Sequence, residues 1–295
     1  MITVNRDSAT SAFRAMGSDI SITVWGEGCQ ELVALAASRL ETLEQAWSRF
    51  RPDSELSRAN ARAGFGAFEI SHDLVELVQR MLDSAELTQG LFNPTMARII
   101  ESLGYNVDFP QVGASSIDSL PAVPSTSGIV LEGNELELSS GVALDPGAIG
   151  KGLAGDIVCR EFMAAGAVGV VADVGGDVVV AGTPGDDIWR IAVVDETSPE
   201  SCLAMVSHES GSFAVATSSV MRKRWAGVHH VIDPRTGTVS DTDLIQATVV
   251  ADSGWKAEAL ATAAMVLGHQ EGEKFLDAMN IEHLLVSNQL VGSAA

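Results

Sequence analysis

Short strand patterns follow one another in the second half of the chain with few helices between them. Each pattern is a run of apolar or alternating residues bounded by turn-forming residues. The runs lie at 168–173, 177–181, 188–194, 213–217, 228–232 and 247–251. Parallel sheets need a long crossover, usually a helix, after each strand. Consecutive strands without such helices therefore predict an α+β fold with mixed antiparallel sheets and packed helices.

The first half of the chain combines a strand with amphipathic helices. Residues 19–26 alternate apolar and polar side chains and predict a strand, whereas residues 30–47 carry an apolar stripe near a 3.6-residue period and predict a helix. A second helix is predicted between Ser71, which suits an N-cap, and Gly90, which suits a helix end.

Turn-forming residues dominate the middle of the chain. Asn93-Pro94 is expected to open a short helix that ends near Gly104. Residues 105–127 are rich in Ser, Pro, Gly and Ala and predict a long loop or an insertion. Gly133-Asn134 lies between two short strand patterns and predicts a tight hairpin.

The chain is strongly acidic. Its 295 residues hold 18 Lys and Arg against 39 Asp and Glu, a formal net charge of −21. Nucleic-acid binding needs clustered basic residues, and so does binding to an anionic membrane surface. The one dense basic cluster, at 222–224, is too small for either role, so we expect no nucleic-acid partner. Lysine is absent before Lys151.

Cysteine usage and hydropathy bear on location. Cys29, Cys159 and Cys202 lie far apart and form no disulfide framework, which favours a reducing compartment. No apolar run reaches the ~18 residues of a membrane span. Residues 1–10 lack the apolar core of a secretory signal, so we expect a cytoplasmic protein, with an exported or anchored form left open if the native N-terminus is longer.

The most glycine-dense segment that could take part in binding or catalysis runs from Asp145 to Asp156 and contains Lys151. Glycines allow backbone amides to approach an anion, and a helix that starts here adds its positive end. The spacing is not that of a Walker A loop. Phosphate binding and a turn with small residues for close packing both remain open at this point.

Two further patterns point to chemistry. Glu258 and Thr262 are four residues apart on a predicted helix, so their oxygens share one face and suit a hard cation such as Mg²⁺. His230, at a strand end before an Asp-Pro turn, suits a general base. The alternatives are a solvated Glu with a packed Thr, and a histidine that bonds to the turn. Asp145, Asp173 and Asp177 give no strong signal of a carboxylate cluster.

Eight segments in the same order make the sequence resemble the FAD:protein FMN transferases, the ApbE-type flavin transferase family once called thiamine-biosynthesis lipoproteins. The matching segments lie at 13–18, 48–60, 90–96, 144–156, 175–177, 216–218, 230–237 and 257–262. The resemblance implies a mixed α+β fold that holds FAD in a cleft between two lobes. It also implies that residues 1–295 form one flavin transferase domain.

The resemblance assigns roles to residues at matching positions. It implies that FAD is lined by Met16, Phe50, Leu91, Phe92, Asn93, Asp145, Lys151 and Ile232. It implies that Glu258, Thr262 and the backbone carbonyl of Ala148 hold Mg²⁺. Its implied catalytic residues are His230 as the base, together with Lys151 and Asp145.

The implied activity is the Mg²⁺-dependent transfer of FMN from FAD to a Thr or Ser of an acceptor flavoprotein, with release of AMP. An FAD pyrophosphatase and a non-catalytic FAD-binding protein remain alternatives. The sequence departs from the family pattern at Glu258, where Asp is usual, at Asn93, where Asp is usual, and at Ser219, where Gly is usual. The lipoprotein signal of many members is also missing.

Overall fold

The computed structural model describes residues 3–5, 8–105, 121–185, 187–222, 224–225 and 228–288. Most of the loop predicted at 105–127 lies outside the described residues, which resume at 121 and form a short 3₁₀ turn at Thr126–Gly128. Among the described helices, none combines the length and apolar character that a membrane span requires.

An eight-stranded sheet forms the centre of the molecule, and every neighbouring pair in it is antiparallel. In spatial order its strands are β1 (Thr3–Asn5), β2 (Ser8–Ala15), β3 (Ser18–Trp25), β7 (Gly169–Val174), β8 (Asp177–Gly182), β11 (Phe213–Ser219), β16 (Leu244–Ala251) and β17 (Glu282–Ser287). This arrangement confirms the α+β prediction.

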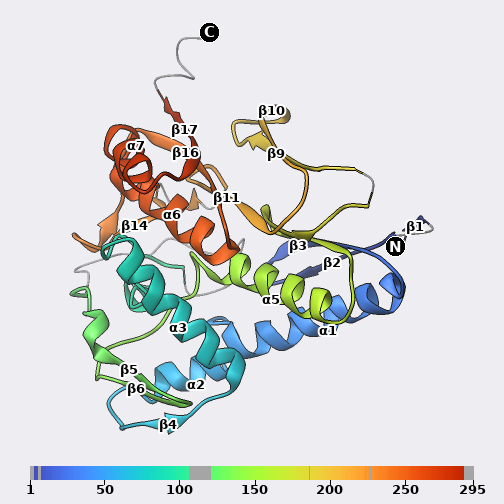
Figure 1. Cartoon of the computed structure of the whole chain (residues 1–295). Coiled ribbons are helices and arrows are strands. Elements are labelled where there is room, and N and C mark those ends of the chain that lie inside the picture. The colour runs from blue at the N-terminus through green and yellow to red at the C-terminus, as the bar shows by residue number, and fades with distance from the viewer. Residues whose placement is uncertain are drawn as a thin grey trace.

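Helices cover one face of this sheet (Figure 1). They are α1 (Cys29–Trp47), α5 (Gly150–Ala164) and α6 (Gly254–Leu267), and α7 (His269–Ala278) packs beside α6. The opposite face packs against a two-stranded ribbon of β9 (Trp189–Asp195) and β10 (Ser198–His208). Strand alternation separates the two cores, because Val179 joins the helix-side core while Val180 joins the ribbon-side core.

A smaller sheet and three helices complete the helix side of the molecule, at the bottom of Figure 1. They are α2 (Glu55–Ala61), β4 (Phe68–Glu69), α3 (His72–Leu87), α4 (Ala97–Ser102), β5 (Ile129–Glu132) and β6 (Glu135–Leu138). Four two-residue strands form two further pairs: β12 (Arg224–Trp225) with β13 (Val228–His229), and β14 (Ile232–Asp233) with β15 (Thr238–Val239). The division into two lobes stays a prediction.

Local sequence signals account for several of these elements. Ser71 caps α3, because its Oγ accepts a hydrogen bond from the Leu74 amide at 3.3 Å. Gly90 takes a left-handed φ of 84° after α3, and Gly133-Asn134 forms the turn between β5 and β6.

Other expectations are corrected. The short helix begins at Ala97, not at Asn93, because the Asn93 side chain bonds to the Thr95 amide and forms a turn first. The strand predicted at 228–232 is interrupted and becomes β13 and β14. Strands β2 and β10 were not predicted, because β10 is mostly exposed and neither carries a clear apolar alternation.

Candidate functional site: a cleft at the start of helix α5

A cleft of about 750 Å³ opens where α5, α6 and the turn between β7 and β8 meet the end of α1. This volume is within the ~300–1,000 Å³ of ordinary ligand sites. Nearly all the site residues proposed from the sequence line it. They are Met16, Phe50, Phe92, Asn93, Asp145, Ala148, Lys151, His230, Ile232, Glu258 and Thr262. Leu91 is not among the lining residues and packs instead against the main core.

Lys151 joins two carboxylates at the inner end of this site. Its Nζ forms an ion pair with Asp177 and lies 3.3 Å from Oε1 of Glu258. Both carboxylates are buried, with side chains 2% and 5% exposed. Burial alone would lower the pKa of Lys151, but Asp177 and Glu258 together raise it above its ordinary range. The ammonium is therefore charged at every physiological pH.

The three charges do not cancel, because two carboxylates face one ammonium. Burial raises the pKa of Glu258, against the opposing effect of Lys151, and the nearby Asp177 raises it further. From the sequence, Asp177 belonged to the 175–177 segment of the resemblance and gave no strong signal of a carboxylate cluster. It also accepts a hydrogen bond from the Thr217 amide at 3.2 Å.

Oxygen atoms suited to a hard cation gather on α6. Glu258 Oε2 accepts a hydrogen bond from the Gly152 amide at 2.9 Å, and Thr262 Oγ1 lies 3.1 Å from Ser218 Oγ. A carboxylate, hydroxyls and the excess negative charge fit Mg²⁺, which needs few protein ligands and keeps several waters. Among the described residues, no group of three or more His, Cys, Asp or Glu gathers to hold a metal ion, so Asp145, Asp173 and Asp177 form no such cluster.

The glycines of the 145–156 segment have two different roles. A Cβ on Gly152 would lie 2.3 Å from backbone atoms of Gly254, and a Cβ on Gly155 would lie 2.7 Å from Val179. These two glycines allow α5 to pack closely on α6 and β8. The start of α5 at Gly150 instead lines the cleft, where the positive end of the helix suits an anion.

The Asp145 carboxylate forms an ion pair with Arg49, which was not predicted as a site residue from the sequence. Its Oδ2 lies 3.1 Å from Nε of Arg49, and both side chains are buried. The Arg49 guanidinium stacks 4.1 Å from the Phe50 ring centroid and 4.7 Å from that of Tyr105. Arg49 lies within the 48–60 segment of the resemblance, but no local pattern directs it into the cleft.

Three arginine side chains, those of Arg14, Arg49 and Arg222, line the cleft together with Lys151. They come from β2, from the residues after α1 and from the residues after β11. Residues so far apart in the sequence meet only through the fold.

Met16 lies in the turn between β2 and β3 with a left-handed φ of 52°, which is uncommon for a residue other than glycine. Its amide donates to Glu44 Oε2 at 2.8 Å, which anchors this turn to α1. The Asn93 side chain is engaged on both sides: Oδ1 accepts from the Thr95 amide at 2.9 Å, and Nδ2 donates to the carbonyl of Pro124 at 3.4 Å.

His230 lines the cleft from the residues between β13 and β14, and Ile232 lines it from the first position of β14. Ile232 is buried in a small apolar cluster with Met96, Ile99, Leu103 and Tyr105. His230 is half-buried and lines the cleft. The neighbouring His229 bonds within the chain, because its Nδ1 accepts from the Val231 amide at 3.3 Å, and burial lowers its pKa.

The chain is similar to a known family of proteins. Residues 16–285 match the model of the ApbE family. A protein of Vibrio cholerae named FAD:protein FMN transferase is 28% identical, and the match covers 84% of this chain and 76% of that protein. A protein of the same name from Treponema pallidum is 27% identical over 79% of this chain and 70% of its own length.

Solved structures show the same fold. The ApbE protein of Thermotoga maritima superposes with a TM-score of 0.84 at 22% identity, covering 95% of this chain and 94% of that one. The apo form of the flavinyl transferase ApbE of Pseudomonas stutzeri gives 0.81 at 23% identity, covering 97% and 93%. With a family model matched over most of its length, this chain belongs to the ApbE family.

Proposed function

We propose that this chain is an FAD:protein FMN transferase. It binds FAD in the cleft, transfers the FMN part to a Thr or Ser hydroxyl of an acceptor flavoprotein through a phosphoester bond, and releases AMP. The observation that carries this proposal is the buried cluster of Lys151, Asp177 and Glu258 at the start of α5. The names of the relatives support the same activity.

The composition of the cleft suits FAD. Apolar and aromatic side chains from Phe50, Met96, Tyr105 and Ile232 line it, and planar flavin or adenine rings pack well on such surfaces. The first amides of α5 provide positive potential for a pyrophosphate, and a divalent cation would offset the two carboxylates that pair with Lys151. A ligand that is both aromatic and anionic uses both features.

In the proposed step, the acceptor hydroxyl oxygen attacks the phosphorus of the FMN half. A new P–O bond forms to the acceptor, the P–O bond to the AMP phosphate breaks, and AMP leaves with its electron pair. His230 accepts the proton of the hydroxyl. Lys151 stabilises the negative charge that moves onto the phosphate oxygens, and this kind of transfer depends mainly on positioning and charge neutralisation.

Glu258, Thr262 and the carbonyl of Ala148 would hold Mg²⁺. The bound ion would neutralise charge on the phosphate oxygens. Asp145, fixed by Arg49, would orient the part of the substrate that contacts it.

The test is to incubate the protein with FAD and Mg²⁺, with and without an acceptor that carries a suitable Thr. AMP and protein-bound flavin fluorescence are measured together. We expect AMP and labelled acceptor in equal amounts, and no label on an acceptor whose target Thr is replaced by Ala. An acceptor that stays unlabelled contradicts the proposal.

Hydrolysis of FAD is the second candidate, because the cluster of Lys151, Asp177 and Glu258 would act on the phosphoryl group in the same way whether water or an acceptor hydroxyl attacks it. FMN and AMP that appear at the same rate without any acceptor would identify a pyrophosphatase. A non-catalytic binder is tested at Glu258, whose longer side chain reaches both Lys151 and the Gly152 amide. Tight FAD binding without turnover, together with activity gained in Glu258→Asp, would identify that third role.

A further inference from the structure

Helix α6 begins without a cap of its own. Its N-cap residue, Ser253, forms no side-chain capping hydrogen bond. The first amides of a helix need acceptors, and a buried helix end without them is unfavourable. In this structure the acceptor comes from another helix.

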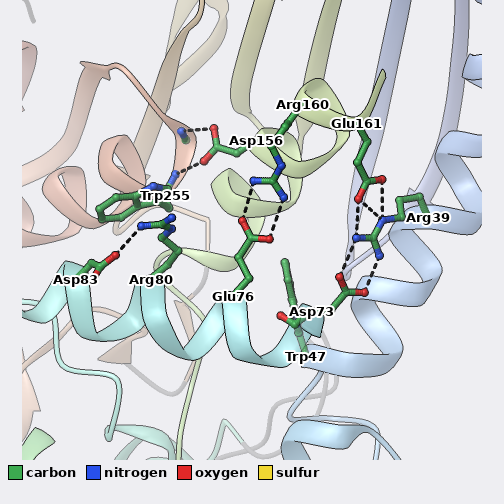
Figure 2. Close-up of polar contacts among 11 residues, drawn as sticks. Arg39, Trp47, Asp73, Glu76, Arg80, Asp83, Asp156, Arg160, Glu161 and Trp255 are labelled. Carbon is green, nitrogen blue, oxygen red and sulfur yellow. Dashed lines mark hydrogen bonds and ion pairs between the residues drawn. The ribbon is translucent and has the colours of Figure 1, made fainter. Parts of the chain in front are cut away.

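Asp156, in the middle of α5, supplies both acceptors. Its Oδ1 accepts from the Gly254 amide at 2.7 Å, and its Oδ2 accepts from the Trp255 amide at 3.1 Å. Figure 2 shows the carboxylate aimed at the start of α6. Carboxylate acceptors form stronger hydrogen bonds than neutral ones, and the negative charge faces the positive end of the helix. We call this arrangement, Asp156 with the amides of Gly254 and Trp255, the α5–α6 clamp.

The clamp lies beside the charge cluster of the cleft. One turn before Asp156, the backbone of Gly152 touches that of Gly254, and the Gly152 amide donates to Glu258. The same stretch of α5 therefore fixes α6 at its first residues and again at Glu258. A helix rises about 1.5 Å per residue as a stiff rod, so a displacement at Gly254 is carried to Glu258 and on to Thr262.

Two further contacts near this helix end use arginine side chains that are more than one-third exposed. Arg80 stacks 5.4 Å from the Trp255 ring centroid, and Arg160 pairs with Glu76 at 2.8 Å (Figure 2). The Arg160 side chain is 55% exposed, and exposed ion pairs contribute little. They do not replace two hydrogen bonds to the partly buried Asp156 carboxylate.

We infer that Asp156 is a positioning residue that holds α6 in the register at which Glu258 and Thr262 present their oxygens to a divalent cation. Asp156 does not line the cleft, so it acts through α6 and touches neither substrate nor metal. The inference rests on the proposed function only in taking Glu258 and Thr262 as cation ligands. It adds a residue that the resemblance did not assign.

The test compares Asp156→Asn with Asp252→Asn. Asp252 precedes the same helix, but its carboxylate is exposed and pairs with Lys256 at 2.8 Å. Binding of Mn²⁺, which takes the same oxygen ligands as Mg²⁺, is followed by electron paramagnetic resonance with and without FAD. We expect binding about tenfold weaker in Asp156→Asn, as for other residues that orient metal ligands, and within twofold of wild type in Asp252→Asn.

A second variant, Asp156→Glu, retains the charge and is expected to recover part of the Mn²⁺ affinity. Unchanged Mn²⁺ affinity in a folded Asp156→Asn protein would overturn the inference, and so would an affinity in Asp156→Glu that is no better than in Asp156→Asn. Wild-type protein that binds no Mn²⁺ would overturn it too. Labelling of the acceptor by the wild type is measured separately. Failure of the positioning role therefore shows in Mn²⁺ affinity, and failure of the transferase proposal shows in labelling.

Discussion

Buried charges at the residue scale set the chemistry of the cleft. Lys151 stays protonated because Asp177 and Glu258 outweigh the effect of burial on its pKa. It was predicted from the sequence as a point charge for phosphate. The structure adds that Lys151 is also the cation paired with two buried carboxylates, Asp177 and Glu258.

Lys151→Ala is therefore expected to lower both stability and FAD affinity. The variant leaves Asp177 and Glu258 facing each other without a cation, and removing one partner of a buried pair typically costs about 3–5 kcal/mol. Urea unfolding and FAD titration measure the two effects. The control is Lys256→Ala, which removes an exposed pair and should change stability by less than about 1 kcal/mol. Unchanged FAD affinity and rate in Lys151→Ala would refute its role.

The pKa of Asp156 predicts how the stability of the protein changes with pH. Burial raises its pKa to about 6, against the effect of the Gly254 and Trp255 amides. The folded protein then binds this proton more tightly than the unfolded chain, so the contribution of Asp156 to stability is greatest below about pH 4 and falls as pH rises through about 6. Between these limits, the free energy of unfolding of the wild type should fall by up to about 3 kcal/mol relative to that of Asp156→Asn.

Urea unfolding of both proteins at several pH values from 4 to 7 checks this difference. Asp252→Asn again serves as the control, because Lys256 offsets burial and lowers the pKa of Asp252. A stability difference between wild type and Asp156→Asn that does not change with pH would contradict the assignment.

At the element scale, the close approach of α5 and α6 brings the charge cluster together. The sequence left two roles open for the glycines near Lys151. In the structure Gly152 and Gly155 allow close helix packing, whereas Gly150 lines the cleft. Most helices and hairpins were predicted because caps and turns are local signals. Strand β10 was not, because its exposed residues carry little apolar alternation.

Gly152→Ala should push α5 away from α6, because the added Cβ would lie 2.3 Å from the Gly254 backbone. Overpacking of this kind costs about 1–3 kcal/mol. Gly150→Ala is the matched control in the same helix, since its Cβ would meet Pro146 at 3.4 Å. Urea midpoints of the two variants should differ clearly, and equal midpoints would show that the helix contact tolerates a methyl group.

At the scale of the whole molecule, a chain of net charge −21 is proposed to bind an anion. The four cations that line the cleft, Lys151, Arg14, Arg49 and Arg222, are each paired with a carboxylate, so the side chains alone give no excess of positive charge there. The two carboxylates beside Lys151 leave a local negative excess when Glu258, whose pKa is raised by burial, is ionised, and a divalent cation would balance that excess.

Removal of divalent cations is therefore expected to weaken FAD binding by about tenfold or more, a change of about 1.4 kcal/mol. Flavin fluorescence is titrated in EDTA, then after Mg²⁺ is restored, with NaCl added to match ionic strength. Equal FAD affinity in EDTA and Mg²⁺ would show that the cationic side chains suffice alone.

The sequence by itself determined the α+β class, the principal helices and hairpins, the resemblance to a flavin transferase family and a set of candidate site residues, all of which except Leu91 line the cleft. These inferences depend on periodicity, caps and motifs carried by neighbouring residues. Only the tertiary structure decided which charges meet. Lys151 and Asp177 are 26 residues apart, and Asp156 and Gly254 are 98 apart. An ion pair or a clamp between such residues leaves no local pattern, because its energy exists only when the fold brings both partners out of water.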